Sequence, residues 1–394
     1  MSVQEVITEN NSDRGLRWYS RREPVILLVL STMAVASFLA VSGLSKAYKR
    51  QQQELGQEWF TRAVADQEGG DLRRAVTEFE AAQLYARGNF VYQLKLAQTL
   101  AALGRTDEAY SYLLNLREQQ PDNGTVNLEL ARILAKKGDI DSAIRYYHDA
   151  IYAVWDTDPE KQRRTVRLEL VTFLLQQNAK TQAESELIAL QASLPPDVAL
   201  RTRVGNLFLK TQDFERALAE FRTALNLDRR NAAALAGAGR AAFELGRYNV
   251  AQRYLESALA ANASDADSAN LLKTARLVLQ LDPSRRHISA AKRSKIVLSA
   301  FNTAGERLQT CNLPTMSGAQ GLSTTTQEPS LAVRWKAMKP KLTELELRRN
   351  PDLAENAMDL VFDIEQQTSA QCGSPQGADL ALLLISRLHE SNER

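Results

Sequence analysis

The stretch EGGDLRRAVTEFEAAQ, residues 68–83, contains the pattern that decides the fold. A turn residue, Gly70, is followed five positions later by Ala75; Phe79 comes four positions after that, and Ala82 three positions later again. The same skeleton returns as ALGRTDEAYSYLLNL at residues 102–116 and as KKGDIDSAIRYYHDA at residues 136–150. The i, i+4, i+7 spacing places the three side chains that follow the turn on one face of a helix.

The small residue of this skeleton recurs along the chain with a nearly constant period. Successive intervals are 34, 34, 40, 34 and 34 residues. Because a small side chain lets two helices cross closely, the period predicts helix–turn–helix units that stack on one another to bury their apolar faces. The aligned alanines are Ala75, Ala109, Ala143, Ala183, Ala217 and Ala251, and the turn residues five positions before them are Gly70, Gly104, Gly138, Asn178, Gln212 and Gly246.

Composition agrees with an all-α protein. Of the 394 residues, 44% are hydrophobic and 24% are charged, which is typical of a folded chain. Helix formers such as Ala, Leu, Glu, Arg and Gln dominate, and no alternating strand pattern occurs. The net charge is only +2, with basic and acidic residues interleaved, so the sequence has no basic patch of the kind that binds nucleic acid.

The repeated residues resemble the tetratricopeptide repeat family over about residues 56–283. The resemblance implies a right-handed α-solenoid of antiparallel helix pairs, with about six repeats and a partial one. It also implies a concave groove, lined by the first helix of each unit, that binds a protein or peptide partner. Two features depart from the pattern: six extra residues around VWDTDPEKQRRT at 154–165, and Val171 in the fourth unit where most units have Ala or Gly.

The register of the resemblance places a set of polar side chains in this groove. We expect a carboxylate of the partner to pair with Arg132, Arg203 and Arg240. The alternative is that these charges are solvated helix faces without a role. The two-carboxylate pattern of chaperone-binding family members does not carry over, because Gly237 stands where that pattern needs Asn. The predicted groove residues are Lys95, Gln98, Arg132, Lys136, Arg203, Asn206, Lys210 and Arg240.

The N-terminal region contains an apolar run, PVILLVLSTMAVASFLAVSGL, at residues 24–44. About 20 apolar residues are enough for a helix to cross the hydrocarbon core, so we predict a transmembrane helix over 24–45 after a tail at 1–23. The alternatives are a cleaved signal peptide, whose apolar region is normally shorter, and a buried soluble helix. A short tail before one span favours a cytoplasmic N-terminus and a body in the periplasm or another extracytoplasmic space, although Lys and Arg are balanced on the two sides.

The C-terminal region, residues 284–394, has no repeat and is predicted to form a small helical bundle with a loop at 312–329. The chain's two cysteines, Cys311 and Cys372, both fall at predicted helix ends there. Outside the cytoplasm they are compatible with one disulfide; the alternative is two unrelated thiols.

Signatures of catalysis are missing from the sequence. The three histidines have no metal-ligand neighbours at helical spacing, and no phosphate-loop, nucleophile-elbow or zinc-protease motif occurs. We therefore predict no enzyme activity, no metal, no cofactor and no small-molecule substrate. The favoured function is a membrane-anchored scaffold in bacterial envelope biogenesis or secretion. One alternative is a structural or oligomerising subunit whose groove is permanently filled, and another is an enzyme with its site in the C-terminal bundle.

Overall fold

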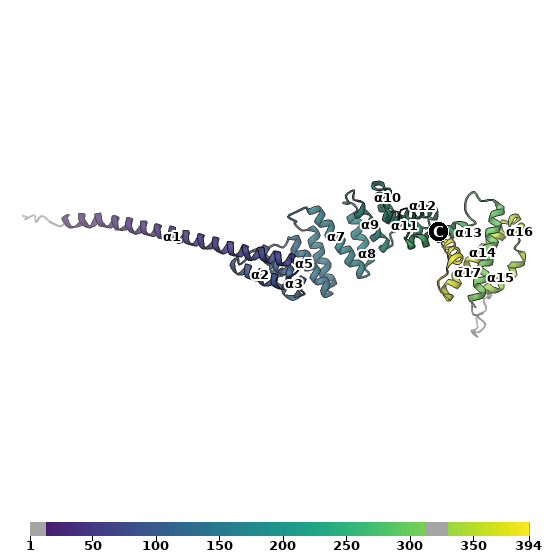
Figure 1. The fold of residues 1–394 in the computed structure, drawn as a ribbon, viewed down its shortest axis with the longest axis horizontal. Coiled ribbons are helices and arrows are strands. Elements are labelled where there is room, and N and C mark those ends of the chain that lie inside the picture. Colours follow the sequence, from purple (N-terminus) through teal and green to yellow (C-terminus); the bar gives the residue numbers. More distant parts are fainter. Residues whose placement is uncertain (1–12, 312–329, 394) are drawn as a thin grey trace, which may run out of the picture. The chain divides into compact units, whose positions relative to one another are not determined.

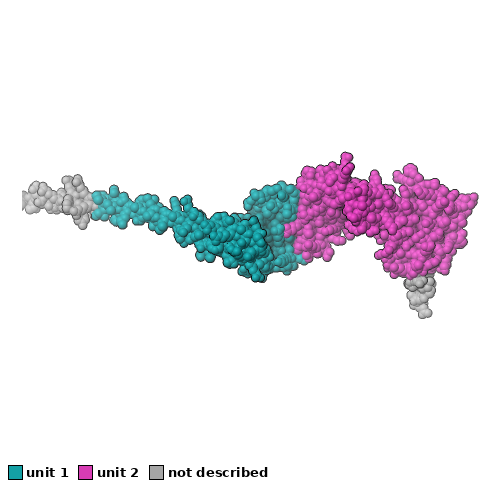
Figure 2. Space-filling model, viewed as in Figure 1, with its two compact units in different colours: residues 1–166 teal, residues 167–394 magenta. Residues whose placement is uncertain are grey.

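The computed structural model describes residues 13–311 and 330–393, with side chains described for 24–311 and 330–390. Eighteen α-helices and one 3-10 helix make up this part of the chain, which contains no β-strand, so the all-α prediction is confirmed. The helices form two compact units, residues 1–166 and 167–394 (Figure 2). The predicted loop at 312–329 and most of the predicted tail lie outside the described residues.

The first unit contains a long helix followed by short helices that return on one another (Figure 1). α1 runs from the predicted span into the first repeat, where it packs against α2. No linker therefore separates the apolar run from the repeats. The helices of this unit are α1 (Asp13–Glu68), α2 (Leu72–Tyr85), α3 (Phe90–Leu103), α4 (Thr106–Gln119), α5 (Gly124–Lys137) and α6 (Ile140–Tyr152), followed by the start of α7 (Pro159–Gln176).

The second unit continues the helix pairs and ends in the C-terminal bundle. Its helices are α8 (Lys180–Gln191), α9 (Val198–Thr211), α10 (Phe214–Leu227), α11 (Ala232–Glu244), α12 (Tyr248–Ala261), α13 (Ala266–Leu281), α14 (Ala290–Cys311), α15 (Leu331–Met338), the 3-10 helix η1 (Lys339–Lys341), α16 (Glu344–Arg349), α17 (Pro351–Cys372) and α18 (Gly377–Glu393).

The aligned small residues lie where helices pack together, as the repeat pattern predicts. All six have no exposed surface, and the large apolar residue four positions after each is at most 3% exposed. The turn residues adopt the left-handed conformation, including the non-glycine residues Asn178 (φ 59°) and Gln212 (φ 68°). Asp and Asn side chains cap many of the helices that follow, as Asp213 does by accepting a hydrogen bond from the Arg216 backbone N–H at 3.0 Å.

The extra residues after the third repeat fold back onto that repeat. The Val154 N–H donates to the Asp122 carbonyl at 2.9 Å, and the Val154 carbonyl accepts from the Gly124 N–H at 3.1 Å. The Trp155 ring lies against Gly124, where a Cβ atom would come within 2.3 Å of the ring. The start of this insertion is therefore held against the third repeat by two backbone hydrogen bonds and by the half-buried Trp155 ring.

The C-terminal bundle shares one hydrophobic core with the last repeats. Tyr248 of α12 and Val278 of α13 belong to the same buried cluster as Phe301 of α14 and Ile385 of α18. Burial raises the pKa of Tyr248 to about 12. α13 packs against both α12 and α18, so the last helix of the chain covers the end of the repeat array.

Candidate functional site

The first helices of consecutive repeats lie side by side in the second unit, where α11 packs between α9 and α13. Arg203, Asn206 and Lys210 are exposed on α9. Their i, i+3, i+7 spacing places them on one face of that helix, which we call the α9 face. Among the described residues, none of these three side chains has a hydrogen bond or an ion pair. The α9 face therefore presents a guanidinium, an amide and an ammonium group to solvent.

Arg240, on the neighbouring α11, is already paired. Its Nη2 atom lies 3.2 Å from Oδ2 of Asp267 on α13, and both side chains are exposed. An exposed pair of this kind contributes about 0–1 kcal/mol, so a partner's carboxylate can replace Asp267 at small cost. Of the three arginines that the sequence predicts for carboxylate binding, Arg240 is thus available only by exchange.

Two of the predicted groove residues of the first unit, Gln98 and Arg132, are both hydrogen-bonded to Glu129. Gln98 on α3 donates from Nε2 to Oε1 of Glu129 on α5 at 3.1 Å. Arg132 donates from Nη1 to the same oxygen at 3.1 Å. Lys95 is half-buried and Lys136 is exposed. Glu129 therefore offsets the positive charge that the sequence pattern suggests for this stretch.

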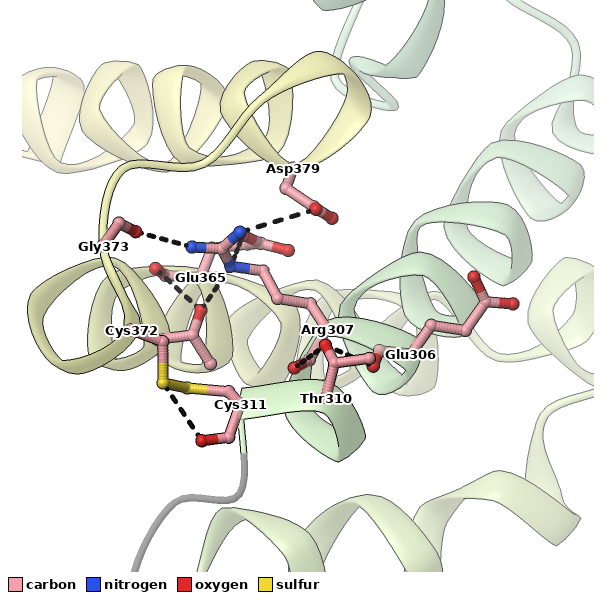
Figure 3. The surroundings of a disulfide bond; sticks show 9 residues. Glu306, Arg307, Thr310, Cys311, Glu365, Cys372, Gly373 and Asp379 are labelled. Atoms are coloured by element: carbon pink, nitrogen blue, oxygen red, sulfur yellow. Dashed lines mark hydrogen bonds and ion pairs between the residues drawn. A yellow bond between two sulfur atoms is a disulfide. The ribbon is translucent and has the colours of Figure 1, made fainter.

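A second polar cluster lies beside the cysteines, which are joined by a disulfide with their Cα atoms 5.7 Å apart (Figure 3). Arg307 of α14 donates from Nε to Oγ1 of Thr368 at 2.8 Å and from Nη2 to the Gly373 carbonyl at 3.0 Å. Its guanidinium also lies 3.5 Å from the Glu365 carboxylate and 3.6 Å from the Asp379 carboxylate. One arginine thus faces two acids at the junction of α14, α17 and α18.

The two acids are hard to ionise together. Glu365 has no exposed surface, and neither of its oxygens has a hydrogen-bond partner among the described residues. Burial, assisted by the charge of Asp379, raises the pKa of Glu365 to about 8, although Arg307 acts in the opposite direction. Burial also raises the pKa of Asp379. No pattern in the sequence predicted this cluster, although Arg307 precedes Cys311 by four residues and Glu365 follows the buried Ile364.

The described residues contain no group of three or more His, Cys, Asp or Glu side chains placed to hold a metal ion. They contain one helix, the part of α1 from Pro24 to Glu68, that is long and apolar enough to cross a membrane. Its apolar side chains are exposed, with Val25 at 61% and Phe38 at 70%.

Comparison with known proteins identifies the repeat. The family model for the tetratricopeptide repeat matches residues 100–153 and 208–275. No curated protein matches the chain.

Several solved structures are similar to parts of the chain. The C-terminal part of a repeat-containing protein from Cytophaga hutchinsonii has 16% identity and a TM-score of 0.45, covering 61% of this chain and 94% of that one. PilF from Pseudomonas aeruginosa has 14% identity and a TM-score of 0.40, covering 56% and 97%. YrrB, described as having an unusual peptide-binding site, has 16% identity and a TM-score of 0.39, covering 48% and 95%. Likenesses of this size say nothing about what the present chain binds.

Proposed function

Because the chain carries tetratricopeptide repeats, we propose that it is a single-pass membrane-anchored scaffold that binds a protein or peptide partner through the first helices of its repeats. The observation that carries the proposal is the α9 face, where Arg203, Asn206 and Lys210 are exposed without partners in the described part of the chain. A planar guanidinium beside an amide suits an extended segment that ends in, or contains, a carboxylate.

The anchor in this proposal is the apolar part of α1. Its side chains are exposed and its length exceeds the roughly 30 Å of the hydrocarbon core. Anchoring would confine the scaffold to the membrane face and raise its effective concentration towards partners there. The cysteine pair supports a body outside the cytoplasm, because disulfides persist mainly in oxidising compartments. We place the function in envelope biogenesis or secretion on these grounds.

The test is photo-crosslinking in native membranes from a reporter amino acid at Arg203, followed by mass spectrometry of the captured species. A reporter at Arg222, which is exposed on the second helix α10 of the same repeat, is the matched control. We expect a protein captured from position 203 and not from 222, with capture reduced by Asn206→Ala. Capture only of a second copy of the chain would favour the oligomerising subunit instead. Equal capture from both positions would contradict the proposal.

The anchor and its orientation are tested separately. Full-length protein should stay with membranes after alkaline carbonate extraction, and a reporter fused to the C-terminus should be active only outside the cytoplasm. Release by carbonate, or a shortened mature N-terminus, would identify a peripheral protein or a cleaved signal sequence and would overturn the anchor.

A further inference from the structure

We propose that the groove between α1 and the turn joining α2 to α3 binds the anionic headgroups of the bilayer that α1 crosses. The proposal rests on the membrane anchor proposed above. It adds to that anchor a specific lipid site on the first repeat.

The groove lies entirely within the first unit. It encloses about 900 Å³ and is open to solvent. One wall is the part of α1 from Tyr48 to Gln57, and the other is the chain from Tyr85 to Tyr92. Tyr92 joins the two walls. Its hydroxyl donates to Oε1 of Gln57 at 3.0 Å, and its ring stacks on the Phe60 ring of α1 with the ring centroids 4.5 Å apart.

The charges that line the groove are mainly positive. Lys49, Arg50 and Arg87 line it, and Glu54 is its one acidic lining residue. These four side chains are all exposed. Among the described residues, none of the three basic side chains has an ion pair or a side-chain hydrogen bond, so their charge is not offset within the protein. A phosphate-bearing headgroup is complementary to such a site.

The position of the groove along α1 selects a lipid over a soluble anion. The apolar run ends at Leu44 and α1 continues without a break. At 1.5 Å per residue, Tyr48 lies about 6 Å beyond the hydrocarbon edge, within the headgroup layer of about 5–8 Å. The backbone of Arg50 lies about 9 Å beyond that edge, just outside the layer but within reach of it through a long side chain. Tyr48 is 61% exposed, as expected for an amphipathic ring at a membrane interface.

The second wall lies farther from the apolar run, beside Gly56, which is about 18 Å beyond Leu44 along α1. α1 leads away from the membrane and α2 returns along it, because Gly56 lies against Ala82 and Tyr85 near the end of α2. Arg87, just after α2, therefore lies at the membrane-facing end of the repeat. Arg73, in the first turn of α2, lies at the opposite end of the same helix. This pair of exposed arginines provides a site residue and a matched control.

The experiment uses the full-length chain in nanodiscs containing phosphatidylcholine and phosphatidylglycerol, with native mass spectrometry to count each lipid retained by the protein. We expect retention of phosphatidylglycerol above its share of the disc. Arg87→Gln should reduce that excess about two- to fivefold, because each basic residue near the surface contributes about 1 kcal/mol. Arg73→Gln should leave the excess unchanged, and millimolar inorganic phosphate should not displace the lipid.

Several outcomes would overturn the site. The phosphatidylglycerol excess could be unchanged by Arg87→Gln, or reduced as much by Arg73→Gln as by Arg87→Gln. Either result would show that the basic side chains attract the lipid in general and that the groove is not a specific site. Displacement of phosphatidylglycerol by free phosphate, or binding of an acidic peptide to the chain in discs of phosphatidylcholine alone, would assign the groove to a soluble ligand. Failure of the chain to enter discs at all would instead refute the anchor, which distinguishes failure of the proposed function from failure of the lipid site.

Discussion

At the scale of single residues, the packing of Phe221 explains why glycine stands at position 237, where the two-carboxylate pattern of chaperone-binding tetratricopeptide repeats needs an asparagine. The ring has no exposed surface and lies against Gly205 of α9 and Gly237 of α11. A Cβ atom at Gly237 would come within 2.3 Å of the ring, and one at Gly205 within 2.8 Å. An asparagine at position 237 therefore has no room, and the absence of the two-carboxylate pattern has a steric cause.

Gly237→Ala should destabilise the second unit. In a helix interior this change ordinarily stabilises by about 1 kcal/mol, but overpacking a buried contact costs about 1–3 kcal/mol, so we expect a net loss of up to about 2 kcal/mol. Urea unfolding followed by circular dichroism measures the loss. The double variant Gly237→Ala, Phe221→Leu should lose less than the sum of the two single variants. Additive losses would mean that the ring does not create the restriction.

Glu365 should make the second unit less stable as pH rises. The pKa of Glu365 is about 8 in the folded protein and near 4.5 for an ordinary glutamate side chain, so the folded state holds a proton that the unfolded chain releases. The stability that the protonated Glu365 side chain contributes to the folded state is fully present below pH about 4.5, and it is lost as pH rises through about 8. The raised pKa of Asp379 acts in the same direction, and Arg307 on α14 opposes both shifts.

Glu365→Gln should flatten this dependence, with unfolding measured between pH 5 and 9 by the same assay. Each unit of pKa shift corresponds to about 1.4 kcal/mol of stability. Glu355→Gln, on the exposed side of the same helix, is the control and should retain the wild-type slope. A wild-type protein with constant stability across this range would contradict the prediction.

At the scale of helices, the sequence predicts the features that depend on the local repeat pattern, but it does not predict contacts between segments that are distant in the sequence. The period predicts the helix pairs, the buried alanines and the left-handed turns at Asn178 and Gln212, because each depends on neighbours within one repeat. It does not predict that Trp155 packs on Gly124, or that α18 packs on α13, because these contacts join segments with no shared pattern.

For the candidate site too, the sequence predicts the features that depend on local spacing and does not predict the contacts between helices. The exposed face of α9 follows from helical spacing, and Arg203, Asn206 and Lys210 are indeed exposed there. The Arg240–Asp267 pair does not follow from spacing, because it depends on how two successive first helices face each other. The hydrogen bonds that Gln98 and Arg132 both donate to Glu129 do not follow from helical spacing either.

The cysteine pair should stabilise the junction of α14 and α17. The bond closes a loop with a sequence separation of 61 residues, for which chain entropy gives about 4 kcal/mol. We expect urea unfolding of the oxidised chain to shift to lower urea after reduction, with an intact mass that rises by the two hydrogens of the thiols. The Cys311→Ser, Cys372→Ser variant is the control, since reductant should not change its unfolding. An oxidised chain that contains two free thiols would contradict the bond.

At the scale of the whole molecule, the C-terminal bundle completes the repeat array instead of forming a separate module. The buried cluster is continuous from Tyr248 to Ile385, and Leu388 on α18 lies against Gly246, the turn residue between α11 and α12. A solenoid needs its last repeat covered, and here α18 provides that cover.

Leu388→Ala should therefore loosen helices that lie far away in the sequence. We expect faster amide hydrogen exchange in α12 and α13, by a factor corresponding to about 2 kcal/mol for the partly buried side chain. Glu390→Ala, at an exposed position on the same helix that contacts Gln366 of α17, should leave this exchange unchanged. If the exchange of α17 and α18 alone increased, the bundle would be an independent unit.

The unbroken path of α1 from the apolar run to the first repeat has a rotational consequence. Each residue added after Ser45, before the groove wall begins at Tyr48, would turn the first repeat and its groove by about 100° about the helix axis and raise them by about 1.5 Å. Two added residues would point the basic groove to almost the opposite azimuth with hardly any change in height. Seven would lift it by about 10 Å yet restore its bearing to within about 20°. If α1 is the proposed membrane anchor, the direction that the groove faces and its height above the bilayer are thus set separately by the length of one helix.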